Sequence, residues 1–338
     1  MRMSKKIVHL IPYDGIGGVE TAARSMGELN HNGIDFKVEF IFKKGGFGLF
    51  NPLALLFTVG RIFSRNPDVL IVSLWRSAIV GILAKCLRPR LRLVVFIHDT
   101  ADAHFLDFII TRLALLLTYR VWADSMASLR ERFPGLISQK CQVISFVTQR
   151  FKIAPEQKVK PCFIFWGRLH QKKGLDHALL IFAEIIKHQP TAQFWIIGPD
   201  GGVFQSTQRL CESLGLKDKV SFLGAATLDE IENYAHKATF YLQASRYEGM
   251  AMSVVEAMQM GLVPIVTPVG EIPSYCSHGT NALIIKSNRQ VVEDVNDLLN
   301  NNEKYQTIRN KAIATWKERP LYAQSILQAC ESLVKEDN

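Results

Sequence analysis

The chain has 338 residues, which is enough for two domains that each bury a core. Hydrophobic residues make up 48% and charged residues 21%, a composition that excludes an intrinsically disordered chain. The formal charge of +9 lies in residues 1–150, which hold 20 Lys and Arg against 11 Asp and Glu, whereas residues 151–338 hold 20 of each. A basic first half predicts an acidic partner for one domain: an anionic membrane surface, a nucleic acid or a phosphorylated substrate.

The cysteines and the first residues bear on the cellular compartment. Six cysteines are present, and none forms the CxxC pair typical of structural metal sites. Several stand in apolar runs, so free thiols and a reducing cytoplasm are predicted. The first ten residues lack both a long apolar core and a small-residue cleavage site, and they predict a strand rather than a signal peptide.

In the first half, short apolar runs alternate with helical patterns. Strands are predicted at 7–11, 36–42, 69–72, 91–97, 121–123 and 143–146. Helices are predicted near 19–31, 52–64, 77–87, 104–118 and 126–133. Strands that alternate with helices indicate βαβ units and a parallel sheet.

Two apolar segments, 47–63 and 105–122, come close to a membrane signal. Both are interrupted by charge and fall short of the roughly 20 apolar residues that a spanning helix needs. Two interpretations stay open. The segments are either helices buried in an α/β domain or amphipathic patches that rest on a membrane interface.

Residues 147–161 are polar, contain two prolines and are predicted to link two domains. The alternation then restarts, with strands predicted at 162–165, 194–197, 220–222, 240–242, 263–266 and 282–285. Helices are predicted near 175–188, 203–214, 228–236, 252–260, 289–299, 302–316 and 320–335.

The predicted fold class is α/β, with two doubly wound Rossmann-like domains facing across a cleft. The first domain is expected at 1–150 and the second at 162–318, and the final helix, 320–335, is expected to pack back on the first. In such sheets ligands bind outside the carboxyl ends of the strands.

The stretch 248–256 (EGMAMSVVE) follows a predicted strand and loop and opens a predicted helix. Free N–H groups at a helix N-terminus bind anions, so this backbone is predicted to cradle a diphosphate. The cradle consists of Gly249, Met250, Ala251, Met252 and Ser253. Glu256 can accept hydrogen bonds from the vicinal hydroxyls of a ribose, and Glu248 can do the same for a sugar. Together these groups predict a nucleotide-sugar site.

The stretch 167–174 (GRLHQKKG) joins a predicted strand to a predicted helix. Arg168 and Lys173 can converge on one anion at the end of that strand, because an Arg fork and a Lys point charge together suit a diphosphate. Glycines in the loop 15–18 let the backbone approach a ligand, so Gly17 and Gly18 are predicted to contact the donor. A dinucleotide site is disfavoured there because Glu20 replaces the third glycine of GxGxxG.

His98 ends a predicted strand and is a candidate for binding a sugar hydroxyl or the transferred group. Its alternative is a capping or buried histidine. The chain contains no Asp-x-Asp pair, so no Mg²⁺ or Mn²⁺ site is predicted for a nucleotide sugar. Fixed cations and N–H dipoles would then neutralise the leaving diphosphate.

These strings resemble glycosyltransferase family 4, whose members have the GT-B fold. The matching strings are 167–174 (GRLxxxKG), 245–257 (SxYEGMxMxVxEA), 261–265 (GxVPI) and 267–270 (TxVG), in the order of the family. Weaker support comes from 17–20 (GGVE), His98 and 123–125 (ADS). Residues 271–274 (EIPS) and Ala282 depart from the family pattern and leave the local loop geometry open.

The resemblance implies retaining transfer of a sugar from a nucleotide diphosphate donor, without a bound metal or other cofactor. It places Arg168 and Lys173 on the diphosphate, Glu256 on the ribose and Glu248 on the donor sugar. His98 belongs to the acceptor side. The catalytic candidates are thus His98, Glu248, Arg168 and Lys173, and no protein nucleophile is implied.

The preferred function is transfer to a glycan or lipid-linked acceptor in the synthesis of a bacterial-type cell-surface polysaccharide such as lipopolysaccharide, O-antigen or capsule. The protein is expected in the cytoplasm, peripheral at the inner face of an anionic membrane. Nucleic acid is not an expected partner, because the basic half shows no helix-turn-helix or aromatic-basic module. A GT-B sugar-nucleotide epimerase, a phosphorylase and a non-catalytic nucleotide-sugar or glycan-binding subunit stay as alternatives, and no cofactor lysine for a phosphorylase stands out.

Overall fold

The structure is a computed structural model. It describes residues 4–15, 17–42, 51–136, 140–156 and 159–335. The chain divides into an N-terminal unit, Met1–Gln149 with Pro320–Asn338, and a C-terminal unit, Arg150–Arg319.

The N-terminal unit is built on a seven-stranded sheet in the order β2-β3-β1-β4-β5-β6-β7. Its strands are β1 (Lys5–Tyr13), β2 (Glu28–His31), β3 (Ile34–Phe42), β4 (Val69–Ser73), β5 (Arg92–Ile97), β6 (Arg120–Ala123) and β7 (Cys141–Val143). All neighbouring pairs are parallel except β2 with β3. The inner strands are nearly continuous runs of buried apolar residues, as expected for a parallel sheet covered on both faces.

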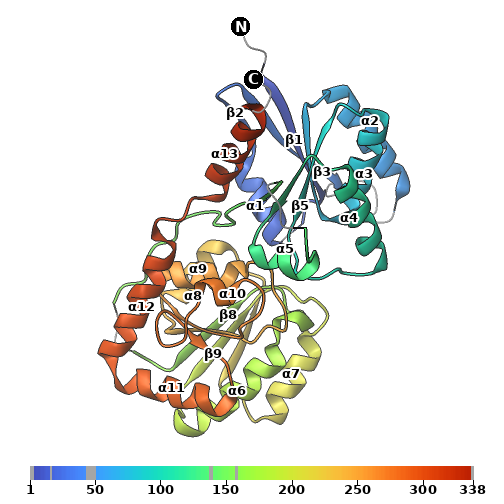
Figure 1. Cartoon of the computed structure of the whole chain (residues 1–338). Coiled ribbons are helices and arrows are strands. Elements are labelled where there is room, and N and C mark those ends of the chain that lie inside the picture. The colour runs from blue at the N-terminus through green and yellow to red at the C-terminus, as the bar shows by residue number, and fades with distance from the viewer. Residues whose placement is uncertain (1–3, 16, 43–50, 137–139, 157–158, 336–338) are drawn as a thin grey trace. The chain divides into compact units, whose positions relative to one another are not determined.

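Helices cover both faces of this sheet (Figure 1). One layer holds α2 (Pro52–Arg65), α3 (Leu74–Leu87), α4 (Phe105–Leu117) and α5 (Met126–Arg132), whose buried side chains share one core with the sheet. On the other side α1 (Gly18–Met26) contacts α13 (Tyr322–Lys335). The last helix is thus part of the N-terminal unit, where the backbone N–H of Tyr322 donates to the carbonyl of Val147.

Two predictions in this unit are wrong: the strand expected at 143–146 is found at Cys141–Val143 (β7), and the helix expected at 19–31 ends at Met26. Gly27 caps the helix with a φ of 58°, and residues 28–31 form the antiparallel strand β2. Asn32 and Gly33, with φ of 47° and 77°, form the tight turn between β2 and β3. Asn-Gly is a strong signal for a two-residue hairpin, and this local signal overrides the helical pattern.

The C-terminal unit has a six-stranded parallel sheet in the order β10-β9-β8-β11-β12-β13. Its strands are β8 (Cys162–Trp166), β9 (Gln193–Ile197), β10 (Val220–Gly224), β11 (Phe240–Gln243), β12 (Val263–Val266) and β13 (Leu283–Ile284). Its helices are α6 (Leu175–His188), α7 (Phe204–Ser213), α8 (Leu228–Ala235), α9 (Met252–Met260), α10 (Ile272–Tyr275), α11 (Asn288–Asn300) and α12 (Asn302–Lys317), with a 3-10 turn η1 (Gln171–Lys173).

The strand order of this second sheet locates a site. From β8 the chain builds outward through β9 and β10, then returns to place β11 on the other side of β8. Open α/β sheets bind ligands outside the carboxyl ends of the strands at such a reversal. The loops that leave β8 and β11 carry Arg168, Lys173 and Glu248, so the sheet brings two distant predicted stretches to one edge.

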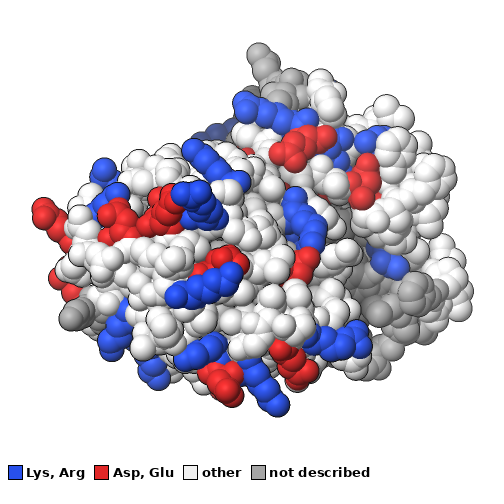
Figure 2. Space-filling model, turned by 90° about the horizontal axis from the view of Figure 1, so that it is seen from below, with Lys and Arg blue, Asp and Glu red and all other residues white. Residues whose placement is uncertain are grey.

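Most of the two apolar segments is helical; residues 47–50 lie outside the described residues, and residues 120–122 belong to strand β6. Residues 52–63 belong to α2, and residues 105–117 form α4. Among the described residues, none of the helices is both long and apolar enough to cross a membrane. On the face shown in Figure 2, basic and acidic side chains are interspersed and no field of one sign stands out.

Candidate functional site

Glu248 is the most enclosed carboxylate of the site, with 5% of the residue exposed. Its Oε1 accepts hydrogen bonds from Lys173 Nζ at 2.8 Å, from Gln243 Nε2 at 2.9 Å and from Ser245 Oγ at 2.7 Å. The first contact joins η1 to the loop after β11, two segments 75 residues apart. The structure therefore brings Lys173 and Glu248 together as a buried charged pair with added donors, which a buried carboxylate requires.

Gln243, the last residue of β11, organises the polar floor beneath Glu248. It is fully buried, and its Oε1 accepts from Tyr241 Oη at 2.5 Å and from Ser253 Oγ at 2.9 Å. This residue was not predicted from the sequence, although a glutamine that ends an otherwise apolar strand is a recognisable signal. Because the hydroxyl of Ser253 is engaged with Gln243, the group that Ser253 offers to a ligand is its backbone N–H.

The loop from Glu248 ends at the N-terminus of α9. Ala251 is the N-cap residue and has a left-handed backbone, with φ of 54° and ψ of 64°. No side chain caps this helix, so the N–H groups of Met252 and Ser253, its first two residues, have no acceptor in the helix and no cap, whereas the N–H of Val254 donates to the carbonyl of Ala251 at 2.9 Å. An uncapped helix N-terminus attracts anions through these N–H groups and the helix dipole. The strained left-handed alanine fixes the direction of the cradle.

Glu256 lies on the second turn of α9, with its carboxyl among packed atoms. Its Oε2 accepts a hydrogen bond from Trp166 Nε1 at 2.7 Å. Burial raises the pKa of Glu256 to about 7, and the bond from Trp166 and the charge of Lys173 hold it below the value that burial alone would give. The carboxyl predicted to hold a ribose thus titrates near neutral pH.

The segment 267–275 supports the cradle from behind. Gly270 has a φ of 55°, and a Cβ atom on it would lie 2.0 Å from the carbonyl oxygen of Glu248. The hydroxyl of Tyr275 donates to the carbonyl of Met250 at 2.8 Å, and the N–H of Glu271 donates to the carbonyl of Gly249 at 3.1 Å. The residues that depart from the family pattern, 271–274, thus hold the loop through backbone bonds and the short helix α10.

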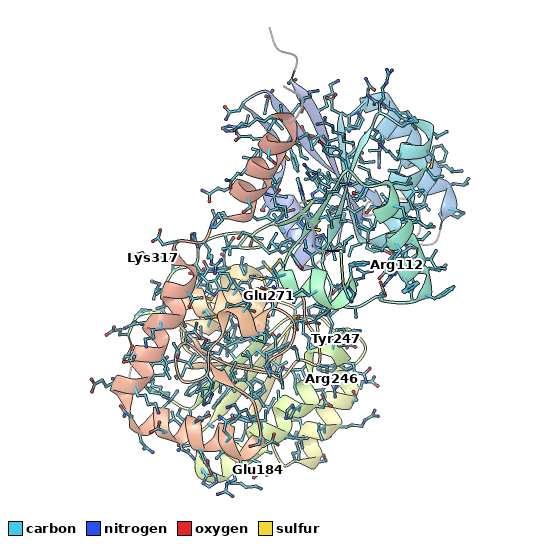
Figure 3. The ribbon with its side chains drawn as sticks, viewed as in Figure 1. Arg112, Glu184, Arg246, Tyr247, Glu271 and Lys317 are labelled. Carbon is cyan, nitrogen blue, oxygen red and sulfur yellow. The ribbon has the colours of Figure 1, made fainter. Side chains whose placement is uncertain are left out.

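Arg246 anchors the same loop on its outer side. Its guanidinium forms a bidentate pair with Asp176 of α6, at 3.1 Å from Nη1 to Oδ1 and 2.5 Å from Nη2 to Oδ2, and also donates to the carbonyl of Gln171. Tyr247, which is 46% exposed, lies next to it (Figure 3). Planar bidentate pairing fixes geometry as well as charge, so the loop that carries Glu248 is tied to the N-terminus of α6.

Arg168 takes a different direction from Lys173. It is exposed, and its side-chain stem packs so closely on Gly201, in the loop after β9, that a Cβ there would lie 2.8 Å from Arg168 Cγ. Lys173 instead passes Gly167 on its way to Glu248. Convergence of the two cations on one anion stays a prediction.

In the N-terminal unit, His98 follows β5 and is buried. Its Nε2 and the Nε2 of His9 each lie 2.8 Å from Ser73 Oγ. A hydroxyl has one proton, so Ser73 donates to one imidazole and accepts from the other. Burial lowers the pKa of His9 to about 3 and, together with the charges of His9 and Arg132, holds the pKa of His98 well below its usual value. Both rings are therefore neutral at pH 7.

The loop with the predicted donor contacts Gly17 and Gly18 lies at the carboxyl end of β1. Gly17 is the N-cap of α1 and Gly18 its first residue, and no side chain caps this helix. Arg24 of α1 secures the loop, because it donates to Asp14 Oδ1 at 3.0 Å and to the carbonyl of Gly15 at 2.7 Å. The N–H groups at the start of α1 thus offer a second anion-binding position, in the other unit.

Residues 147–315, half of the chain, match the profile of the family described as Glycosyl transferases group 1. The chain belongs to this family. Within the matched range lie Arg168, Lys173, Glu248 and Glu256, whereas Gly17, Gly18 and His98 lie outside it.

Curated proteins match part of this chain. The GDP-mannose:cellobiosyl-diphosphopolyprenol alpha-mannosyltransferase of Xanthomonas oryzae is 27% identical over 135 residues, 40% of this chain and 35% of that protein. The mannosylfructose-phosphate synthase of Agrobacterium fabrum is 32% identical over 124 residues, 35% of this chain and 27% of that protein. The chain thus spans about a third of the length of these relatives.

Solved structures match over both units. The Anabaena protein Alr3699/HepE in complex with UDP and glucose has a TM-score of 0.78 at 20% identity, over 98% of this chain and all of that chain. The sucrose-phosphate synthase of Thermosynechococcus elongatus has a TM-score of 0.77 at 14% identity, with the same coverage. At this identity the likeness establishes the fold, which is the two-sheet GT-B fold of these proteins.

In the part of the chain that the structure describes, no group of three or more His, Cys, Asp or Glu side chains could hold a metal ion. The cations predicted to neutralise the diphosphate are Lys173 and Arg168, in the segment that follows β8. Independence from metals stays a prediction for this member of the glycosyl transferases group 1.

Proposed function

We propose that the chain is a retaining glycosyltransferase of the family 4 type, which transfers a sugar from a nucleotide diphosphate donor to a glycan or lipid-linked acceptor. The observation that supports this proposal most strongly is the Lys173–Glu248 pair beside the uncapped N-terminus of α9. That arrangement offers a cation and free N–H groups to a diphosphate, and a carboxylate to the attached sugar.

The roles of the other residues follow from their positions. Glu256 holds the ribose hydroxyls, and its bond from Trp166 fixes the orientation of its carboxyl. Lys173, Arg168 and the N–H groups of α9 neutralise the charge that develops on the leaving diphosphate, which is the largest electrostatic demand of this reaction. His98 serves the acceptor side as a neutral hydrogen-bonding group. The proposal requires neither a metal nor another cofactor.

The relatives favour a place in cell-surface polysaccharide synthesis. The Xanthomonas relative is a GDP-mannose:cellobiosyl-diphosphopolyprenol alpha-mannosyltransferase, and another relative is the Vi polysaccharide biosynthesis protein VipC/TviE of Salmonella typhi. We therefore propose a polyprenol-linked or glycan acceptor and a cytoplasmic location at the inner face of the membrane. The basic first half supports contact with an anionic surface.

The test is a donor panel. UDP-, GDP-, ADP- and dTDP-sugars are screened for a rise in melting temperature, since bound donor stabilises the folded chain, and the donor that binds is assayed for nucleotide release. Lys173→Met should abolish release, whereas Lys172→Met, in the same turn, should retain it. The absence of any binding donor would refute the proposal.

Two alternatives give different outcomes in the same assay. A non-catalytic subunit would bind a donor and release no nucleotide with any acceptor. A sugar-nucleotide epimerase would convert the donor sugar without an acceptor. Retention is read separately, from the anomeric configuration of the product by NMR.

A further inference from the structure

Helix α4 of the N-terminal unit is apolar on its exposed side as well as on the side that packs on the core. Its exposed side includes Phe105, Phe108, Leu113 and Leu116, which are 73%, 43%, 45% and 81% exposed. These positions are spaced three to five residues apart and form one stripe along the helix. On the opposite side Asp107, Thr111 and Ala114 are buried, and Ile110, Leu115 and Leu117 pack partly buried against the core. A helix that only packs on a core carries polar residues on its exposed side instead.

A buried ion pair fixes this orientation. Asp107 Oδ1 lies 2.6 Å from Arg132 Nη2 at the end of α5 and accepts from Thr111 Oγ1 at 2.9 Å. Arg132 Nε also lies 2.7 Å from Asp102 Oδ1. Turning α4 to bury its phenylalanines would break the buried pair of Asp107 and Arg132, which is unfavourable. The apolar stripe on the outside is therefore built into the fold.

Helix α2, in the same layer, also exposes large apolar residues. Leu53, Leu56 and Phe57 are 53%, 60% and 64% exposed, while its other side buries residues into the core: Ala54, Thr58, Val59 and Ile62. Between α2 and α4 lies α3, which sits close to the sheet at Gly81, where a Cβ would meet Leu93 at 2.9 Å. Figure 1 shows the three helices as one layer on one side of the sheet. We call the exposed apolar residues of α2 and α4 the apolar face.

Basic residues outnumber acidic ones around the apolar face. The three helices carry five basic residues (Arg61, Arg65, Arg76, Lys85 and Arg112) and one acid, the buried Asp107. Two acids outside these helices pair with some of them: Glu39 with Arg61 and Arg65, and Asp102 with Arg112. Arg112 lies within the stripe of α4, with its guanidinium carbon 3.6 Å from the ring centroid of Phe108. Beyond α3, the 68% exposed Leu87 is followed by Arg88 and the exposed Arg90.

We propose that the apolar face docks on a lipid bilayer with anionic headgroups. Apolar side chains enter the headgroup and acyl boundary, and basic residues near them hold the lipid phosphates. A second copy of the chain fits less well. A twofold contact sets the same patch against itself, so the basic residues of both copies would meet without acidic partners on these helices.

The experiment is flotation of the full chain with vesicles of phosphatidylcholine alone or with 30% phosphatidylglycerol. We expect binding to the anionic vesicles at low salt and weak binding to the neutral ones. Phe105→Ser with Leu116→Ser should weaken binding at least tenfold, as should Leu56→Ser with Phe57→Ser. The matched control is Ile153→Ser with Leu180→Ser, two exposed apolar positions of the C-terminal unit, which should bind like the parent chain.

A variant with fewer positive charges tests whether basic residues near the apolar face hold the lipid phosphates. Arg88→Gln with Arg90→Gln should weaken binding to anionic vesicles and leave binding to neutral vesicles unchanged. The altered side chains are largely exposed, so equal melting temperatures verify that every variant folds. Donor binding measured without lipid keeps this proposal distinguishable from the proposed transferase activity.

Either of two outcomes would overturn the proposal that the apolar face docks on a lipid bilayer. One is that the parent chain does not bind anionic vesicles. The other is that the serine variants bind them as well as the parent does. A dimer in solution that the same serine variants dissociate, without vesicle binding, would assign the apolar face to a second copy instead.

Discussion

Glu256 connects the protonation of a single side chain to donor binding. Burial raises its pKa to about 7, so the carboxylate is the main form only above that pH. The ionised form can accept both hydrogen bonds from a ribose, whereas the protonated form loses an acceptor position. We expect kcat/KM for the donor to rise with pH through about 7, because this ratio reports groups of the free enzyme. Glu256→Gln should remove that rise.

Trp166 offers a second test of the same carboxyl. Its indole N–H stabilises the ionised form of Glu256, so Trp166→Phe should move the rise in kcat/KM to higher pH without abolishing it. A pH profile that is the same in the parent and in both variants would show that Glu256 does not control donor binding.

Gly270 is a second position where a single added atom, a Cβ, is expected to disturb the site. A methyl group there would collide with the carbonyl of Glu248, and the residue has a positive φ. Gly270→Ala should shift the loop and lower kcat/KM for the donor by about 100-fold, since a displacement near 1 Å has that effect in other enzymes. Gly279→Ala is the control, because Gly279 has a φ of 68° but open space around it. Equal losses in both variants would point to backbone strain alone.

At the scale of elements, two glycines with open surroundings should respond in opposite ways. Gly33 closes the β2–β3 turn with a φ of 77°, so Gly33→Ala should lower the free energy of unfolding by about 1 kcal/mol. Gly60 lies inside α2, and Gly60→Ala should raise it by about 0.5–1 kcal/mol. Chemical denaturation measures both. A stabilising Gly33→Ala would contradict the turn geometry.

The same turn marks the limit of prediction from sequence. The parallel strands were predictable because both faces of each are covered, so their residues form short apolar runs that turn residues interrupt. Strand β2 was not, because its sequence, ELNH, is short and polar. Its pairing depends on the backbone of Asn32 and Gly33, which periodicity does not report. Helix α10 was missed for a similar reason, since four residues do not complete a helical period.

The residues of the site likewise divide into those that local sequence patterns predict and those that they do not. Lys173 and Glu248 were predictable because they lie in short strings next to strand ends, and the parallel sheet then brings them to one edge. Gln243 and Trp166 were missed because their roles arise from contacts across strands: a buried amide that carries Glu248, and an indole that reaches Glu256. The separate directions of Arg168 and Lys173 depend on how Gly201 packs, which no local pattern contains.

At the scale of the whole molecule, acid stability should differ between the two units. The pKa of His9 is lowered from 6.5 to about 3, so the unfolded chain binds a proton that the folded N-terminal unit excludes. Stability from this group is fully present above pH 6.5 and is lost as the pH falls, by about 1.4 kcal/mol per unit. Glu256 has the opposite sign: its raised pKa makes the C-terminal unit lose stability as the pH rises from 4.5 toward 7.

Urea unfolding between pH 4.5 and 6.5 separates these effects. Because each unit has its own core, we expect one transition per unit, each with its own dependence on pH. His9→Gln should reduce the slope of the N-terminal transition only, and part of that slope should persist because the pKa of His98 is also well below its usual value. Glu256→Gln should change the slope of the C-terminal transition only. His188→Gln, at an exposed position on α6, should change neither. If both transitions responded to His9→Gln, the cores would unfold as one cooperative body and the assignment of His9 and Glu256 to separate transitions would fail.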